Sequence, residues 1–210
     1  MKLIGQYDSP FVRRVAVALH CYAIAYDHIP WSTFGDGNKL AQFNPLKRVP
    51  TLVLDDGDVL IDSGAILDHL DEIVGPERAL MPRSGVARRE ALRRIAMVTG
   101  AAEKAVSFFY AKLFSTGLNP DFVARCEGQI VEVLAALKKD CAARTEDWWQ
   151  GSKPGHDDIA VACVVRFLRE AYPGLVDLAH CPALSRHCAR AEALPAFATV
   201  QQPFIPPQSQ

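Results

Sequence analysis

The chain has 210 residues, of which 50% are hydrophobic and 22% are charged, and its formal net charge is −1. This composition is typical of a soluble globular protein with one large or two small domains, and the near-neutral charge gives no indication of a nucleic-acid or membrane partner. The longest aliphatic run, Ile159 to Val165, is far shorter than the roughly 20 residues that a membrane-spanning helix needs, so we expect a protein that binds neither nucleic acid nor membrane.

The first eighty residues predict a thioredoxin-like α/β domain, residues 1–80. We expect strands at 3–5, 24–29, 51–54 and 59–61, and helices at 10–21 and 63–74. The Asp-Gly pair at 56–57 favours a hairpin between the last two strands, because glycine tolerates the positive φ of primed turns. A strand-helix-strand unit gives a right-handed parallel pair, to which the hairpin adds two antiparallel strands.

Residues 81–85 predict a linker, since a Gly-Pro pair at 75–76 stops the preceding helix. Beyond it, residues 86–203 follow a helical period and predict an all-α domain. Two apolar stripes step by three or four residues. The first comprises Leu92, Ile95, Thr99, Ala102, Val106, Phe109 and Leu113, and the second Phe122, Cys126, Ile130, Val133, Leu137 and Cys141. Residues 159–168 should form the central buried helix and 182–193 a further one, and the prolines near the end predict an irregular tail, residues 204–210.

Six cysteines lie at positions 21, 126, 141, 163, 181 and 188, without a Cys-x-x-Cys pair. No signal-peptide pattern precedes the first strand. We therefore expect reduced cysteines that pack as small hydrophobic residues in a cytoplasmic protein. The His-Cys pairs at 180–181 and 187–188 fit no zinc spacing, so we expect no metal site.

Ser9 stands where the first helix begins, between Asp8 and Pro10. Serine suits the N-cap of a helix and proline its first turn. The free N–H groups and the dipole at this end stabilise an anion, and a thiolate is such an anion. A Ser9 hydroxyl that donates to the sulfur would raise the thiolate fraction at neutral pH. The alternative is that Ser9 only caps its helix, and Tyr7 is a second candidate for the hydroxyl donor.

Two further segments offer groups that could bind a ligand. A cis Val49-Pro50 bond would turn the N–H and C=O of Val49 outward, where an extended peptide could pair with them. The alternative is a trans proline that starts an edge strand. At the start of the third helix, Ser63 is a natural N-cap whose neighbouring N–H groups could receive a carboxylate, while Asp62 could accept an ammonium group. Capping alone is again the alternative.

The three segments together predict one binding site. In a thioredoxin-like domain they meet at one edge of the sheet, where they offer a thiolate site, a clamp for a peptide backbone and a clamp for an α-amino acid head group. A cysteine-containing peptide with a free α-amino acid end satisfies all three.

With these residues, the chain resembles bacterial cytosolic glutathione transferases over nearly its whole length. The resemblance rests on the motifs Tyr7-Asp8-Ser9-Pro10-Phe11, Asn44-Pro45-Leu46-Lys47-Arg48-Val49-Pro50, Asp62-Ser63-Gly64, Gly151-Ser152-Lys153-Pro154 with Asp158-Ile159-Ala160, and Leu194-Pro195-Ala196-Phe197. It implies a detoxifying homodimer that uses glutathione as cosubstrate, has no tightly bound cofactor, and directs the thiolate at a small hydrophobic electrophile.

The resemblance also implies roles for individual residues. Ser9 takes the catalytic position, and glutathione is bound by Ser9, Phe11, Arg48, Val49, Asp62 and Ser63. The electrophile pocket is expected to be lined by Phe11, Phe108 and Tyr110. Lys104 and Phe114, on the same helix as Phe108 and Tyr110, are further candidates. A different class of function, a glutathione-transferase fold that binds or regulates without turnover, is the alternative.

Three departures from the family pattern matter. Serine at position 9 replaces the cysteine of members that run thiol-disulfide chemistry, and a hydroxyl forms no mixed disulfide. Lys47 stands where many relatives have glycine, which predicts a stiffer or altered turn. Gly155 stands where the motif before Asp158 has serine or threonine, so a hydroxyl cap is lost.

Overall fold

A mixed four-stranded sheet forms the N-terminal part of the protein. The computed structural model describes residues 1–115 and 117–206. The strands are β1 (Lys2–Ile4), β2 (Asp27–Ile29), β3 (Thr51–Val53) and β4 (Val59–Ile61), in the order β2-β1-β3-β4. β1 and β2 are parallel and the other pairs antiparallel, which confirms the predicted thioredoxin-like arrangement, although β2 is shorter than the predicted strand.

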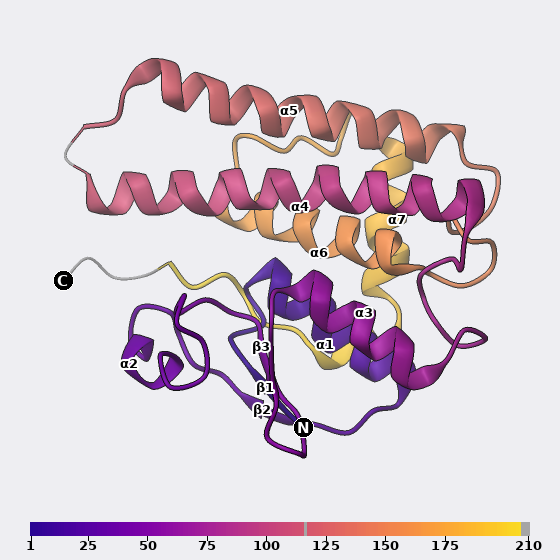
Figure 1. Cartoon of the computed structure of the whole chain (residues 1–210). Helices are drawn as coiled ribbons and strands as arrows, with labels where there is room; N and C mark the ends of the chain where they lie inside the picture. The colour runs from indigo at the N-terminus through magenta and orange to yellow at the C-terminus, as the bar shows by residue number, and fades with distance from the viewer. Residues whose placement is uncertain (116, 207–210) are drawn as a thin grey trace.

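Helices α1 (Pro10–Tyr22) and α3 (Ser63–Val74) pack together beside the sheet, and the short α2 (Gly37–Leu40) lies apart from them (Figure 1). The sequence does not predict α2, whose single turn lies in a polar link. Gly75 ends α3 with a φ of 77°, as the Gly-Pro pair predicts.

The C-terminal part is a bundle of helices: α4 (Gly85–Phe114), α5 (Pro120–Ala143), α6 (His156–Ala171), α7 (Pro182–Glu192) and α8 (Pro195–Thr199). The two long helices α4 and α5 lie side by side, and α6 runs between α4 and the N-terminal domain (Figure 1). Residues 159–165 of α6 are all buried, which confirms the predicted central helix. The sequence does not predict α8.

The predicted apolar stripe of α4 is right only in part, because Ile95 and Val106 are half-buried against the core. Of its members only Ala102 is buried, and Leu92 is 45% exposed. The buried face is instead Ala91, Arg94, Val98, Ala101, Ala102, Ala105 and Phe108. Small alanines let α4 approach α6 closely, so the buried face follows small residues rather than the largest aliphatic ones. The predicted stripe of α5 agrees better with the buried face of that helix: Cys126, Ile130, Leu137 and Cys141 are buried, while Phe122 is exposed.

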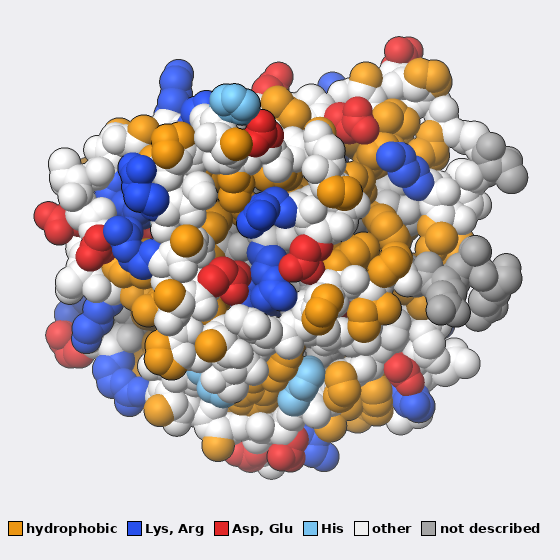
Figure 2. Space-filling view, turned by 180° about the vertical axis from the view of Figure 1, so that it is seen from behind, with side chains coloured by type: hydrophobic (Ala, Val, Ile, Leu, Met, Phe, Trp, Pro, Cys, Tyr) orange, Lys and Arg blue, Asp and Glu red, His pale blue; other side chains and the backbone are white. Residues whose placement is uncertain are grey.

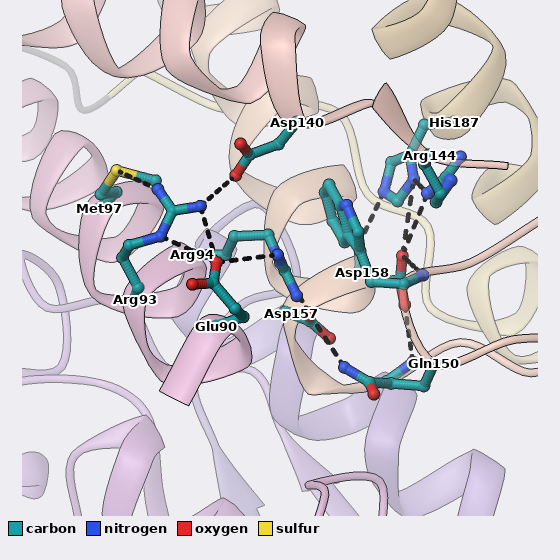
Figure 3. Close-up of polar contacts among 12 residues, drawn as sticks. Glu90, Arg93, Arg94, Met97, Asp140, Arg144, Gln150, Asp157, Asp158 and His187 are labelled. Carbon is teal, nitrogen blue, oxygen red and sulfur yellow. Dashed lines mark hydrogen bonds and ion pairs between the residues drawn. The ribbon is translucent and has the colours of Figure 1, made fainter. Parts of the chain in front are cut away.

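A buried polar network joins four helices of the bundle at the start of α6 (Figure 3). The Arg94 guanidinium of α4 donates to the Asp157 carboxylate at 2.9 Å. The Asp158 carboxylate accepts from the Gly155 N–H at 2.9 Å and from Arg144 at 3.4 Å. The Gly155 position has no room for the usual hydroxyl, since a Cβ there would lie 2.7 Å from Asp157 Oδ1 and 3.1 Å from the Leu80 carbonyl oxygen.

Side chains from both domains fix α1 in place. The Arg13 guanidinium donates to both oxygens of Glu192 in α7, at 2.6 and 2.7 Å, and to the Val200 carbonyl oxygen at 3.0 Å. The Asp71 carboxylate of α3 accepts from the Tyr22 hydroxyl and lies 2.8 Å from His156 Nε2. These contacts hold the helix that carries the candidate catalytic residue against the helical domain.

Four of the six cysteines are buried, Cys21 is exposed and Cys181 is half-buried, and all six are free thiols. Basic and acidic side chains are interspersed on the face shown in Figure 2, consistent with the near-neutral composition. None of the helices over residues 1–115 and 117–206 combines the length and apolarity needed to cross a membrane. The domain boundary at 81–85 stays a prediction, and the last part of the predicted tail, residues 207–210, lies outside the described residues.

Candidate functional site

Three separate segments of the N-terminal domain meet at one small cavity. Its lining comes from the start of α1, the segment that leads into β3, and the start of α3. The lining residues are Phe11, Asn44, Leu46, Arg48, Val49, Pro50, Ile61, Asp62 and Ser63. Five of the six residues that we predict for glutathione binding therefore surround one space. The sixth, Ser9, lies two residues before Phe11 and is not part of the lining.

Ser9 caps α1, as the sequence predicts. Its backbone is extended, with φ −69° and ψ 123°, and its Oγ accepts from the Val12 N–H at 3.4 Å. This bond is long, beyond the usual 2.7–3.2 Å range. A serine hydroxyl has one donor hydrogen besides its acceptor lone pairs, so capping leaves the hydrogen of Ser9 able to donate to another group.

Tyr7, the second candidate for a hydroxyl donor, points elsewhere. Its ring stacks on His28 at 3.8 Å between centroids, and its hydroxyl lies 2.7 Å from the Tyr26 hydroxyl. Burial raises the pKa of the Tyr7 hydroxyl. The Tyr7 side chain thus contacts the β2 side of the sheet, and its hydroxyl is already engaged there.

The Val49-Pro50 peptide bond is cis, one of the two alternatives that the sequence leaves open. Within the described residues, the N–H and C=O of Val49 form no hydrogen bond with the protein. Gly5 makes the close approach of this segment to α1 possible. Its φ is 132°, and a Cβ there would lie 2.5 Å from Val12 Cγ2 and 2.8 Å from Val49 Cβ.

Asn44 holds the proline segment together through its hydrogen bonds. The sequence analysis assigns this residue no structural role. It is 1% exposed. Its Nδ2 donates to the Arg48 carbonyl oxygen at 2.9 Å and to Thr51 Oγ1 at 3.1 Å. Its Oδ1 accepts from the Leu46 N–H at 2.9 Å. The signal was present in the sequence, because asparagine at the head of a loop often bonds to the backbone that follows.

Lys47 is the residue for which the resemblance predicts a stiffer or altered turn. Its φ is 50°, in the left-handed region. A lysine there costs energy that glycine does not. The turn therefore holds Lys47 in a conformation that favours glycine. The neighbouring Arg48 is exposed at the edge of the cavity.

The start of α3 differs from our prediction in one respect. The N-cap is Asp62, not Ser63, because the Asp62 Oδ1 accepts from the Gly64 N–H at 2.7 Å. Ser63 is the first helical residue and is buried. Asp62 has a φ of 71°, an uncommon conformation for a residue other than glycine and one often found at ligand sites. The second carboxylate oxygen of Asp62 has no hydrogen bond among the described residues.

Arg14 is a second residue that the sequence analysis did not single out. It lies one turn beyond Phe11 on α1, and its guanidinium is buried. Its Nε has no hydrogen-bond partner in the part of the chain that the structure describes. Burial lowers the pKa of Arg14 to about 10, and the Asp62 carboxylate favours its charged form.

The residues expected to line an electrophile pocket fall into three groups. Tyr110 and Phe114 contact Phe34 of the N-terminal domain, with ring centroids 5.0 and 5.5 Å apart, and so lie where the two domains face each other. Phe108 is fully buried and stacks on Tyr172, which places it in the core of the bundle rather than on a pocket surface. Lys104 lies in a separate groove between α4 and α5.

Within the described residues, no cluster of three or more histidine, cysteine, aspartate or glutamate side chains could hold a metal ion. What the site offers is a helix N-terminus with a serine hydroxyl, an unpaired backbone N–H and C=O, and a carboxylate beside a helix N-terminus. These groups suit a peptide ligand that carries an anionic sulfur and a zwitterionic end.

Comparison with known proteins identifies the family to which the chain is similar. Two family models match the chain, the glutathione S-transferase N-terminal domain over residues 3–78 and the glutathione S-transferase C-terminal domain over residues 120–190. The glutathione S-transferase U6 of Arabidopsis thaliana is 27% identical over 177 residues, which are 83% of this chain and 75% of that protein. The uncharacterized GST-like protein YibF of Escherichia coli strain K12 is 39% identical over 83 residues, 40% of this chain and 41% of that protein, so that match spans less than half of either.

Two solved structures resemble the fold over nearly its whole length. A glutathione S-transferase from Methylobacterium radiotolerans in complex with glutathione sulfonate has a TM-score of 0.91 and 26% identity, covering 100% of this chain and 98% of that one. A glutathione S-transferase from Methylobacillus flagellatus with GSH bound has a TM-score of 0.87 and 26% identity, covering 97% and 99%. On these matches and the fold, the chain belongs to the glutathione S-transferase family.

Proposed function

We propose that the protein is a glutathione transferase that binds reduced glutathione, stabilises its thiolate and directs it at a small hydrophobic electrophile. The observation that carries this proposal is the convergence of Phe11, Arg48, Val49, Asp62 and Ser63 around one cavity at the mouth of α1. The glutathione and glutathione sulfonate named with the similar structures support the choice of peptide.

In this proposal each segment binds one part of the tripeptide. The N–H and C=O of Val49 pair with the cysteinyl backbone, as an added strand would. The Asp62 carboxylate accepts from the γ-glutamyl ammonium, while Ser63 and the N–H groups of α3 bind the γ-glutamyl carboxylate. Arg48 reaches the carboxylate at the other end. The sulfur then lies at the N-terminus of α1, near Ser9.

Ser9 and α1 supply the chemistry. The hydroxyl hydrogen donates to the sulfur, and the free N–H groups of the helix add a partial positive charge, so the thiol loses its proton at a lower pH than its usual value near 8.5. The thiolate forms a bond to the electrophilic carbon, and the leaving group departs with the electron pair of the bond that breaks. Orientation of the two reactants supplies most of the rate gain.

The electrophile fits best between the domains, beside Phe11 and Tyr110. Phe11 borders the proposed glutathione cavity, and Tyr110 contacts Phe34 across the two domains. An aromatic surface of this kind favours an apolar acceptor. We further propose a cytoplasmic homodimer with a role in detoxification, for which light scattering and a panel of electrophiles are the direct measurements.

The test is the variant Ser9→Ala with Asn119→Ala as its control. Asn119 caps α5 through two accepted hydrogen bonds, at 2.8 and 3.3 Å, and lies outside the cavity lining. Both variants should lose roughly 0.5–1 kcal/mol of stability, because each removes a cap. Only Ser9→Ala should lower turnover with a model electrophile, by about tenfold or more.

Two results would count against the proposal. If Ser9→Ala loses stability but keeps its turnover, Ser9 is only a cap. If calorimetry detects no heat with millimolar glutathione, the protein is a binding or regulatory member of the family that does not use this peptide.

A further inference from the structure

The last described residues of the chain return to the turn that carries Ser9. Gln202 Oε1 accepts from the Tyr7 N–H at 3.0 Å. The Asp8 Oδ2 accepts from the Ile205 N–H at 3.2 Å. The two residues directly before Ser9 are thus both bonded to a segment nearly two hundred positions later, which we name the C-terminal strap, residues 202–205.

The strap is itself anchored to the helical domain. The Arg166 guanidinium of α6 donates to the Gln202 carbonyl oxygen at 3.2 Å, and the Glu170 carboxylate accepts from the Phe204 N–H at 2.8 Å. The Phe204 ring packs edge-on against Phe109 of α4 and Phe167 of α6, with centroids 5.4 and 5.6 Å apart. An aromatic anchor and polar bonds on both sides make the strap a fixed connection rather than a loose end.

The turn before α1 depends on this connection. Within it, the Ser9 N–H donates to the Gln6 carbonyl oxygen at 3.2 Å, and the Ser9 hydroxyl has only the long 3.4 Å bond to Val12. The strap satisfies the half-buried Tyr7 N–H and one oxygen of Asp8. Burial raises the pKa of the Asp8 carboxyl, and the Ile205 N–H works against that rise. Without the strap, the Tyr7 N–H loses its partner and the turn can change its conformation.

We propose that the C-terminal strap positions the Ser9 turn, with Gln202 as the main positioning residue. Gln202 does not touch the ligand in this scheme: it fixes the Tyr7 backbone so that the Ser9 hydroxyl points at the sulfur. The inference rests on the proposed function, because it needs Ser9 to be the thiolate donor. In this proposal the C-terminal strap affects catalysis although none of its residues lines the cavity.

The test compares Gln202→Met with Gln201→Met. Methionine keeps roughly the length of glutamine but offers the Tyr7 N–H only a thioether sulfur, a weak acceptor, in place of the amide oxygen. Gln201 is the exposed neighbour, and its side chain has no hydrogen bond among the described residues. We expect Gln202→Met to lower kcat about fivefold and to raise the thiol pKa of bound glutathione, measured by the ultraviolet absorbance of the thiolate, because a misplaced donor weakens catalysis more than binding. The KM for glutathione should stay within about twofold, since the proline and α3 segments are unchanged. Gln201→Met should behave as the wild type.

A chain that ends at Val200 provides the second variant. It removes the whole strap and should raise the thiol pKa at least as far as Gln202→Met does. Wild-type thiol pKa in both variants, with Ser9→Ala still impaired, would overturn the strap proposal alone. Ser9→Ala with unchanged thiol pKa and turnover would instead overturn the proposed function. A larger KM with unchanged kcat in Gln202→Met would show a binding role and also contradict the proposal.

Discussion

The proline segment should lose its shape, and the protein much of its affinity for glutathione, when Asn44 is replaced by alanine. Asn44 is buried and makes three hydrogen bonds, two donated and one accepted, at 2.9, 3.1 and 2.9 Å. A typical intramolecular hydrogen bond contributes about 1 kcal/mol net. The Thr51 hydroxyl still donates to the Arg48 carbonyl oxygen at 3.1 Å, so that oxygen keeps a partner in the variant. The expected loss is therefore about 2 kcal/mol of the free energy of unfolding.

The effect on binding follows from the position of Asn44. Its bonds span the residues that precede Val49, whose backbone groups are proposed to pair with the cysteinyl part of the ligand. A segment without these bonds must be ordered when the ligand binds, and about 1.4 kcal/mol of such a cost raises the Kd tenfold. We expect a rise in the Kd for glutathione of about that size, measured by calorimetry.

Urea denaturation followed by circular dichroism gives the stability, and Asn38→Ala is the matched control. Asn38 lies in α2, is exposed and has no side-chain hydrogen bond among the described residues. Its replacement should change the free energy of unfolding by less than about 0.5 kcal/mol. If the two variants unfold at the same urea concentration, Asn44 does not hold the segment and the reasoning fails.

Three further predictions concern residues to which no role in binding the ligand is assigned. Gly155→Ser should destabilise the protein by about 1–3 kcal/mol, because its Cβ would lie 2.7 Å from the buried Asp157 Oδ1 and 2.9 Å from Gln150 Cγ; a higher melting temperature would contradict this. Lys47→Gly should stabilise by about 0.5 kcal/mol, since Lys47 has a φ of 50°, and thermal unfolding again measures it. Burial lowers the pKa of His187 from 6.5 to about 4 and raises that of Asp158 from 3.8 to about 7. Acidification therefore lowers the free energy of unfolding through His187 and raises it through Asp158. In the His187→Gln variant only the Asp158 effect remains, so urea titrations should show a stability that rises from about pH 7 to about pH 4. The stability of the wild type should change less over this range, because its two effects oppose each other.

The sign of the His187 prediction follows from its hydrogen bonds. Arg144 donates to His187 Nδ1 at 2.9 Å, and His187 Nε2 lies 3.1 Å from the Asp158 carbonyl oxygen. The ring is thus held neutral, and only the unfolded state takes up a proton between about pH 6.5 and about pH 4. A variant whose stability falls on acidification as steeply as that of the wild type would contradict this account.

Local signals were enough to predict several local features around the candidate site. Ser9 as an N-cap and the hairpin at Gly57 depend on residues within a few positions of one another. The cis bond at Val49-Pro50 is one of two alternatives that the local sequence left open. The sheet order followed from the sequence of elements, because a strand-helix-strand unit and a hairpin leave few topologies open.

The features that sequence reasoning missed depend on distant neighbours or on backbone angles. Asp62, rather than Ser63, caps α3, because its Oδ1 accepts from the Gly64 N–H at 2.7 Å. It does so with a φ of 71°, and no sequence pattern indicates that angle. The buried face of α4 follows alanines that contact α6, which periodicity alone could not rank above larger side chains. A side chain at position 155 would meet Asp157 Oδ1 at 2.7 Å, Gln150 Cγ at 2.9 Å and the Leu80 carbonyl oxygen at 3.1 Å, and the last of these lies 75 positions earlier in the chain.

The three binding segments share one design. Each is fixed by hydrogen bonds on the side away from the proposed ligand: Asn44 holds the proline segment, Gln202 holds the turn of Ser9, and one oxygen of Asp62 caps α3. The groups assigned to the ligand are then the ones left over, namely the Ser9 hydroxyl hydrogen, the backbone of Val49 and the second oxygen of Asp62. Groups that are held in place and still unpaired bind without a large ordering cost. Among the described residues, the Ser9 hydroxyl makes one long capping bond, which leaves its hydrogen free for the proposed contact with the sulfur.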